Sequence, residues 1–185
     1  APPWAAPAGF QRENEMNSEK MSLKEGLRQA IEAEIDGYHF YMMAASKCDD
    51  PKGCQVFEQM AQEELEHVRF LRTQYSFVEK NGKPSQSVRL AGESRLDGMS
   101  PIFSDKIKGR LKEAHFEMSA LSIAIQMELS AVNFYRDRAA ESDDDTVKDF
   151  FSELSKWESG HYNALLNQQQ ALKEDYWADG GFSPF

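Results

Sequence analysis

Six side chains in this 185-residue sequence have the types and the spacing of ligands for two metal ions. One Glu is followed, 30 residues later (64 − 34 and 158 − 128), by a Glu-x-x-His motif. This pattern occurs twice, as Glu34, Glu64 and His67, and as Glu128, Glu158 and His161. The i, i+3 spacing places the Glu and the His of each motif on one face of a helix. Oxygen-rich sites with imidazole suit iron or manganese, and zinc could also occupy them.

Each of the four glutamates interrupts an otherwise apolar helical stripe. Glu34, for example, follows Leu27, Ala30 and Ile31 at steps of three and four residues. Burial of an unpaired carboxylate is costly, and no Lys or Arg lies near the glutamates on these stripes. Bound cations are the simplest way to neutralise them. The alternative is a metal-free polar network, although carboxylates alone cannot donate the hydrogen bonds that it needs.

The elements that must position these residues are helices, because apolar residues recur at helical spacing and no segment alternates like a strand. The first helix opens at the capping box Ser22–Glu25 and runs to about Cys48. The second begins with Asp50-Pro51 and ends near Asn81-Gly82.

A third and a fourth helix occupy the second half of the chain. Ser104-Asp105 can cap the third, which we expect to be kinked or split before about Ser119. The run Asp143–Thr146 separates it from a fourth helix that ends near Asp175.

The two halves of the chain are related by an internal repeat. At an offset of 94 residues (128 − 34), residues 30–46 align with 124–140 without gaps, at polar as well as apolar positions. The residue midway between the two glutamates of each pair falls in a predicted turn: (34 + 64)/2 = 49 and (128 + 158)/2 = 143. The two carboxylates of each hairpin therefore lie at equal distances from the turn and side by side. Chance resemblance between amphipathic helices is the alternative, but it accounts only for the apolar matches.

These residues and their spacing resemble the rubrerythrin-type branch of the ferritin-like superfamily, over about residues 22–175. The resemblance implies an all-α, ferritin-like four-helix bundle, with hairpins 21–81 and 104–175 joined by a long crossover, 82–103. Residues 1–20 are expected to form a poorly ordered arm, and residues 176–185 an irregular aromatic tail.

The resemblance also implies a chemistry. It predicts two iron ions per chain, bound by the six residues above, and a non-haem di-iron oxidoreductase that reduces peroxide or dioxygen as the diferrous centre is oxidised. Tyr41 and Tyr135, each seven residues after a ligand Glu, are implied as partners just outside the ligands, although core packing also explains them. The alternatives are a ferroxidase or iron-storage protein, and a metal-free helical interaction module. By resemblance, we expect a homodimer or a higher homo-oligomer.

Two features depart from typical rubrerythrins. The sequence has no Cys-x-x-Cys pair of the kind that a rubredoxin domain carries, so an electron donor is expected to be a separate protein. Ala131 occupies the position, three residues after Glu128, where an additional Glu ligand is typical. We therefore expect six protein ligands.

Composition excludes several other classes. The formal net charge of −10 opposes binding to nucleic acid. No apolar run reaches the roughly 18 residues that span a bilayer. Only two cysteines are present, Cys48 and Cys54, which fits a reducing compartment, so we expect a cytoplasmic protein. We interpret both as ordinary turn thiols, with a redox or metal role as the alternative.

Overall fold

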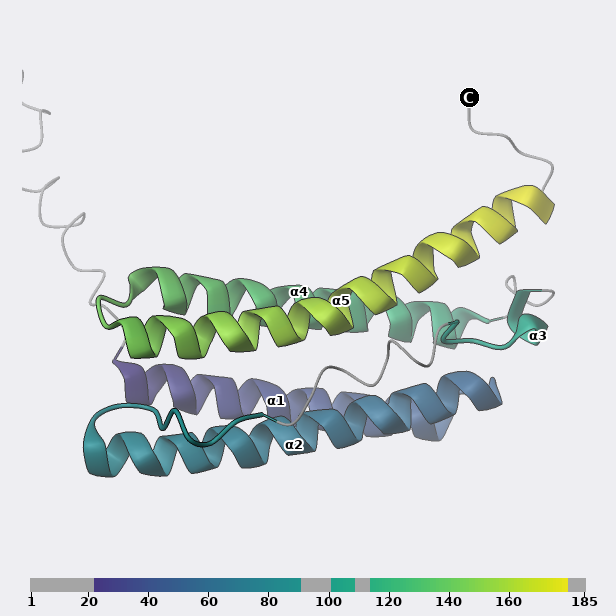
Figure 1. The fold of residues 1–185 in the computed structure, drawn as a ribbon. Helices are drawn as coiled ribbons and strands as arrows, with labels where there is room; N and C mark the ends of the chain where they lie inside the picture. Colours follow the sequence, from purple (N-terminus) through teal and green to yellow (C-terminus); the bar gives the residue numbers. More distant parts are fainter. Residues whose placement is uncertain (1–21, 91–100, 109–113, 180–185) are drawn as a thin grey trace, which may run out of the picture.

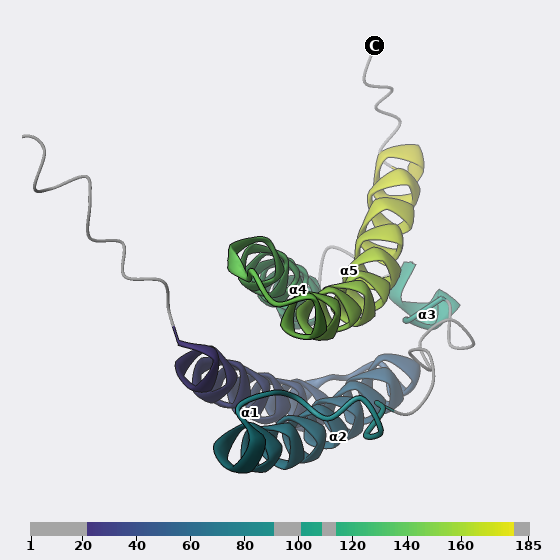
Figure 2. The ribbon, with the colours of Figure 1, turned by 60° about the vertical axis from the view of Figure 1, so that its left-hand side comes forward.

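A computed structural model describes residues 22–90, 101–108 and 114–179, with side chains up to residue 174. The predicted all-α fold is confirmed within this part of the chain. Its helices are α1 (Leu23–Lys47), α2 (Pro51–Asn81), α3 (Asp105–Lys108), α4 (His115–Glu141) and α5 (Asp145–Asp179). The pair α1–α2 and the pair α4–α5 form two antiparallel hairpins that stack as two layers (Figures 1 and 2).

The predicted helix boundaries follow from local hydrogen bonds. The Ser22 hydroxyl accepts the Glu25 backbone N–H at 3.2 Å, which caps α1. The Asp50 carboxylate accepts the Gly53 N–H at 2.9 Å, with proline at the first helical position of α2. Gly82 ends α2 in the left-handed conformation, at φ 74°, which a residue without Cβ adopts at little cost.

Two boundaries in the second half differ in detail from the prediction. The expected break in the third helix separates the short α3 from α4, and residues 109–113 between them lie outside the described part. The fourth helix runs to Asp179 and not to about Asp175, so residues 176–179, expected to be irregular, are helical. No breaker precedes Gly180-Gly181, and Leu172 is buried in the core, so nothing ends the helix earlier. The predicted arm, 1–20, and the rest of the tail, 180–185, lie outside the described residues.

The bundle interior contains two apolar clusters with a polar layer between them. One cluster, which includes Tyr41, Phe57 and Leu165, lies toward the α1–α2 turn. The other, which includes Leu27 and Phe151, lies toward the α4–α5 turn. The glutamates and histidines of the repeat occupy the helical positions between the two clusters. The polar layer is thus enclosed by apolar packing at both ends.

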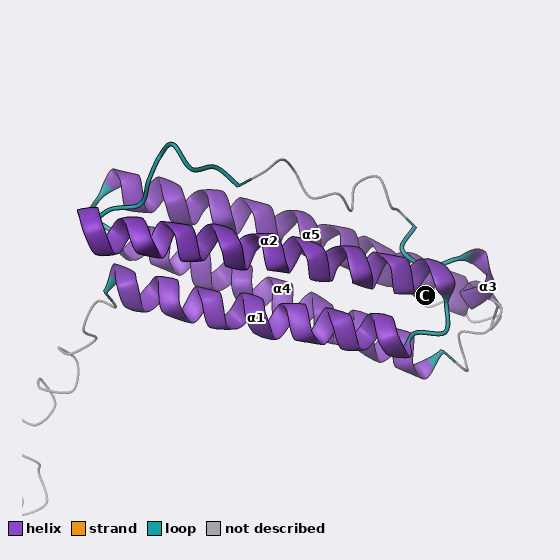
Figure 3. Ribbon diagram, turned by 90° about the horizontal axis from the view of Figure 1, so that it is seen from below, coloured by secondary structure: helices purple, strands orange, loops and turns teal. Residues whose placement is uncertain are grey.

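The end of α2 and the short α3 lie at opposite ends of the bundle (Figure 3), and the structure describes residues 82–90 and 101–104 of the crossover that joins them. Its start is fixed by Gln74, whose side-chain amide accepts the Ser85 N–H at 2.7 Å and donates to the Ser85 carbonyl at 3.0 Å. Its end is fixed by Asp50, which accepts the Ser104 N–H at 3.0 Å and also its hydroxyl. Within the described segments, no helix has both the length and the apolar character needed to cross a membrane.

Candidate metal centre

The structure brings all six predicted residues together in the polar layer. The single glutamates come from α1 and α4, and the Glu-x-x-His pairs come from α2 and α5. None of the six is more than 4% exposed to solvent: Glu34, Glu64, His67, Glu128, Glu158 and His161. Donor groups that are far apart in sequence therefore converge in a site from which bulk water is excluded.

The first group of donors surrounds His67. Its Nδ1 atom lies 3.0 Å from Glu34 Oε2, 3.1 Å from Glu158 Oε1 and 3.5 Å from Glu64 Oε2. One carboxylate comes from α1, one from α2 and one from α5, so three helices contribute to this group together with the imidazole.

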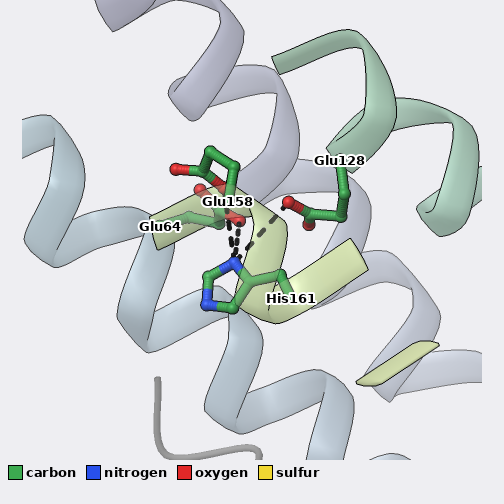
Figure 4. Close-up of side chains that lie close together, drawn as sticks. All are labelled: Glu64, Glu128, Glu158 and His161. Atoms are coloured by element: carbon green, nitrogen blue, oxygen red, sulfur yellow. Dashed lines mark ion pairs between the residues drawn. The ribbon is translucent and has the colours of Figure 1, made fainter. Parts of the chain in front are cut away.

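The second group surrounds His161 and is shown in Figure 4. Its Nδ1 atom lies 3.4 Å from Glu158 Oε2, 3.5 Å from Glu128 Oε2 and 4.0 Å from Glu64 Oε1. Glu64 and Glu158 thus face both imidazoles, whose ring centroids are 5.6 Å apart. Glu34 lies beside His67, and Glu128 lies beside His161.

The arrangement fits a pair of cations. In the second group, one candidate ligand atom of each residue lies within 4.8 Å of all the others, and in the first group the same holds for Glu34, His67 and Glu158. Within the part of the chain that the structure describes, the Nδ1 atom of His161 is buried without a hydrogen-bond partner, although it faces three carboxylates. An orphaned imidazole nitrogen among carboxylate oxygens is what a site for a cation requires. Four carboxylates and two imidazoles would complete the protein ligands of a dinuclear centre.

The pKa shifts in the metal-free site also indicate a place for positive charge. Burial, followed by the nearby Glu34, raises the pKa of Glu64 well above its usual value, and burial raises the pKa of Glu128 to about 7. Burial alone would lower the pKa of His67, but the carboxylates of Glu158 and Glu34 outweigh it and raise that pKa well above the usual value. When no cation is bound, protons on Glu64 and on both imidazoles therefore offset part of the negative charge, while the two imidazoles outweigh burial and lower the pKa of Glu158.

Two buried tyrosines connect the hairpins through the site. The Tyr41 hydroxyl on α1 donates to Glu128 on α4, and the Tyr135 hydroxyl on α4 donates to Glu34 on α1. Burial raises the pKa of both tyrosines well above 10, so both keep the proton that they donate. Sequence reasoning placed them near the ligands, and the structure shows that each contacts the ligand of the opposite hairpin.

Sequence reasoning missed a further buried carboxylate. Glu63 is 1% exposed, and its Oε2 atom lies 2.9 Å from Nε2 of His161, the ring nitrogen that faces away from the site. The sequence held one signal for this residue, because Glu63 directly precedes Glu64. Successive residues are rotated by about 100° around a helix, so the Glu63 side chain points toward α5 beside the site.

A pocket of about 790 Å³ reaches the candidate ligands from one side, between α1 and α4. The carboxylates of Glu34, Glu64, Glu128 and Glu158 line it. The other walls combine small or apolar residues with polar ones: Ala33, Gly37, Ile123, Met127, Ala131 and Phe134, and Gln29, Asp36, Ser122, Gln126, Ser130 and Tyr135. Ala131, where a further carboxylate is typical of rubrerythrins, leaves this approach open.

The cysteines lie apart from this centre, at the α1–α2 turn. The Cys54 thiol donates to the Cys48 carbonyl at 2.9 Å, and the Cys48 thiol donates to the Asp50 carbonyl at 3.2 Å. Burial, with the adjacent Cys54, raises the pKa of the Cys48 thiol. These contacts describe thiols that close a turn.

Comparison with known proteins agrees with the geometry. The family model described as Rubrerythrin matches residues 25–169, which span both hairpins and all six candidate ligands. No curated protein sequence and no solved structure gives a significant match to the chain. Because the matching model covers well over half of the sequence, the chain belongs to the rubrerythrin family.

Proposed function

We propose that this protein is a non-haem di-iron oxidoreductase that reduces peroxide or dioxygen. The observation that carries the proposal is the pair of Glu/His groups around His67 and His161, which share Glu158. Glu64 lies within 4.0 Å of both imidazoles. Two ferrous ions bound there would supply one electron each, which with two protons would reduce peroxide to water or dioxygen to peroxide. Manganese or zinc could occupy the same donors, but zinc could not supply those electrons.

The proposed roles of the side chains follow from their contacts. Glu34 and His67 would hold one ion, Glu128 and His161 would hold the other, and Glu64 and Glu158 would be available to both. Tyr135 donates to Glu34 and also lines the pocket, so it fixes that carboxylate at the side where a reactant arrives. Tyr41 fixes Glu128 in the same way. A ligand whose orientation is fixed in advance loses less freedom when the ion binds.

The pocket supports a small oxidant as the reactant. It reaches four of the candidate ligands and has room for dioxygen or peroxide. The electrons that return the centre to its reduced state would come from a separate donor protein.

Rapid mixing tests the reaction. Protein loaded with ferrous ion under anaerobic conditions is mixed with peroxide, or with dioxygen, and the ferric absorption is followed in a stopped-flow instrument. We expect oxidation faster than that of free ferrous ion, and we expect Glu64→Gln to lose this acceleration. Glu58→Gln, an exposed change on the same helix, is the matched control and should retain it. Oxidation no faster than free iron would contradict the proposal.

Metal content separates this function from its alternatives. An oxidoreductase of this kind holds about two ions per chain in a small assembly, as the two donor groups imply. An iron-storage protein accumulates many ions per chain in a large hollow assembly, and an interaction module binds none. Light scattering combined with metal analysis therefore distinguishes the three.

A further inference from the structure

The internal repeat is broken at one position beside the candidate metal centre. The offset of 94 residues relates Glu64 to Glu158 and His67 to His161. The same offset relates Glu63 to Trp157 (63 + 94 = 157). Each of the six candidate ligands thus has a counterpart of the same type in the other half, whereas at this position a carboxylate in one hairpin corresponds to an indole in the other.

The carboxylate supports His161. Glu63 Oε2 lies 2.9 Å from His161 Nε2, and both side chains are buried. A carboxylate on the outer ring nitrogen holds the ring N–H there, which leaves the lone pair of Nδ1 directed at the carboxylates of the site. It also fixes the ring orientation and makes the imidazole a stronger ligand.

The corresponding side of His67 has no such support. Its Nε2 atom is buried and has no hydrogen-bond partner among the described residues. The Trp157 ring packs edge-on against this imidazole, with centroids 4.8 Å apart and planes at 77°. An indole N–H can only donate a hydrogen bond, so Trp157 cannot accept one from a protonated Nε2.

We infer that the two metal positions are unequal, and that Glu63 and Trp157 set the difference. The position beside His161 fills first and holds its ion more tightly, whereas the ion beside His67 binds second and exchanges more readily. Loss of an outer carboxylate on a ligand histidine typically costs 10–100-fold in metal affinity, so we expect a ratio of about that size between the two positions. This inference rests on the metal binding in the proposed function and not on its redox chemistry.

One consequence is the order of loading. With one equivalent of metal, most of the protein would carry a single ion beside His161, and a different metal added afterwards would enter beside His67. A protein with two equal positions would instead scatter the first equivalent over both.

Cobalt(II) titration tests the inference without any redox reaction. Metal-free protein is titrated with Co²⁺ in competition with a chromophoric chelator, and the two binding steps are fitted. We expect two steps separated by about 10–100-fold. His161→Gln should remove the tighter step and His67→Gln the weaker one, which assigns each step to its position.

Two substitutions then test the cause. Glu63→Gln should weaken the tighter step by about 10–100-fold and bring the two steps together. Trp157→Glu, which copies the other hairpin, should tighten the weaker step by a similar factor, and Trp157→Gln offers a neutral acceptor if the charged residue prevents folding. Glu58→Gln, exposed on α2, should change neither step.

The possible failures are distinguishable. Two equal steps in the parent protein, or a Glu63→Gln variant that weakens both steps alike, would overturn the inference while leaving the proposed function intact. Absence of any Co²⁺ binding would overturn the metal centre itself.

Discussion

Substitution of Glu64 by Gln should have opposite consequences for the metal-free and the metal-loaded protein. Glu64 faces both histidines, at 3.5 Å from His67 Nδ1 and 4.0 Å from His161 Nδ1, so it belongs to both proposed ion positions. Burial and neighbouring carboxylates raise its pKa, so the metal-free fold favours its neutral form. Glutamine imitates that neutral form in size and shape but is a poor ligand for a hard cation.

The expected magnitudes follow from linkage between binding and folding. A metal at 100 times its Kd stabilises the fold by about 2.7 kcal/mol per ion, or about 5 kcal/mol for two. For a domain of this length, that corresponds to a rise in Tm of roughly 10–20 °C. If the Gln variant binds each ion about 100-fold more weakly, the stabilisation falls to about 0.4 kcal/mol per ion at the same metal concentration.

Thermal unfolding followed by circular dichroism provides the assay. Both proteins are stripped of metal and then measured with and without Mn²⁺, which avoids oxidation during heating. We expect the metal-free variant to unfold within a few degrees of the metal-free parent, because the substitution keeps the volume and removes no ion pair with Lys or Arg. We expect only the parent to gain a large increase in Tm with metal.

Two results would refute this reasoning. An equal gain in Tm for the parent and for Glu64→Gln would show that this carboxylate does not bind the ions. A large loss of stability in the metal-free variant would show that the ionised carboxylate itself holds the core together, as in a metal-free polar network.

Three further predictions concern the pH dependence of stability at Asp50, the hydrogen bond of Tyr135, and the release of protons on metal binding. Hydrogen bonds to the Asp50 carboxylate outweigh its burial and lower its pKa, so its contribution is present above the ordinary Asp pKa and is lost as the pH falls through the folded value. Urea unfolding should show Asp50→Ala less stable than the parent by about 2–3 kcal/mol at pH 7, and the difference should shrink as the pH falls below the ordinary Asp pKa. Tyr135→Phe leaves Glu34 without its buried donor and should weaken the metal step assigned to His67 about 10-fold in a cobalt titration, whereas an unchanged step would assign this tyrosine to packing alone. Because the pKa of His67 and of His161 is raised in the metal-free site, metal binding near pH 7 should release protons and should weaken as the pH falls. Calorimetry in buffers of different ionisation enthalpy measures the number of protons released. A heat of binding that does not depend on the buffer would contradict the prediction.

The features predictable from the sequence are those that local rules determine. Helix starts and ends follow from short-range caps such as Ser22 and Gly82, and both lie where the sequence places them. The convergence of the six candidate ligands follows from helical period and hairpin arithmetic, because equal distance from a turn fixes equal height. The internal repeat then supplied the relation between the two hairpins.

The features that escaped prediction depend on contacts between helices. Glu63 reads as a surface residue beside a motif until the position of α5 is known, and Trp157 reads as ordinary packing until its imidazole neighbour is known. The tyrosines could be placed near the ligands, but their bonding to the opposite hairpin depends on how the two layers are aligned. The prediction ended α5 near Asp175, but the helix continues to Asp179. Where the sequence has no helix breaker, the end of a helix depends on its packing and solvation.

Neither hairpin contains a complete centre, since Tyr135 reaches across to Glu34 and Glu158 lies beside His67. A chain cut in the crossover should therefore yield two peptides that bind metal weakly alone and regain binding when mixed. A symmetric pair of identical hairpins would offer the same set of four carboxylates and two imidazoles. Gene duplication and fusion would then have allowed the two hairpins to change independently, so that one has Glu63 where the other has Trp157. In a pair of identical hairpins, any such substitution would appear in both.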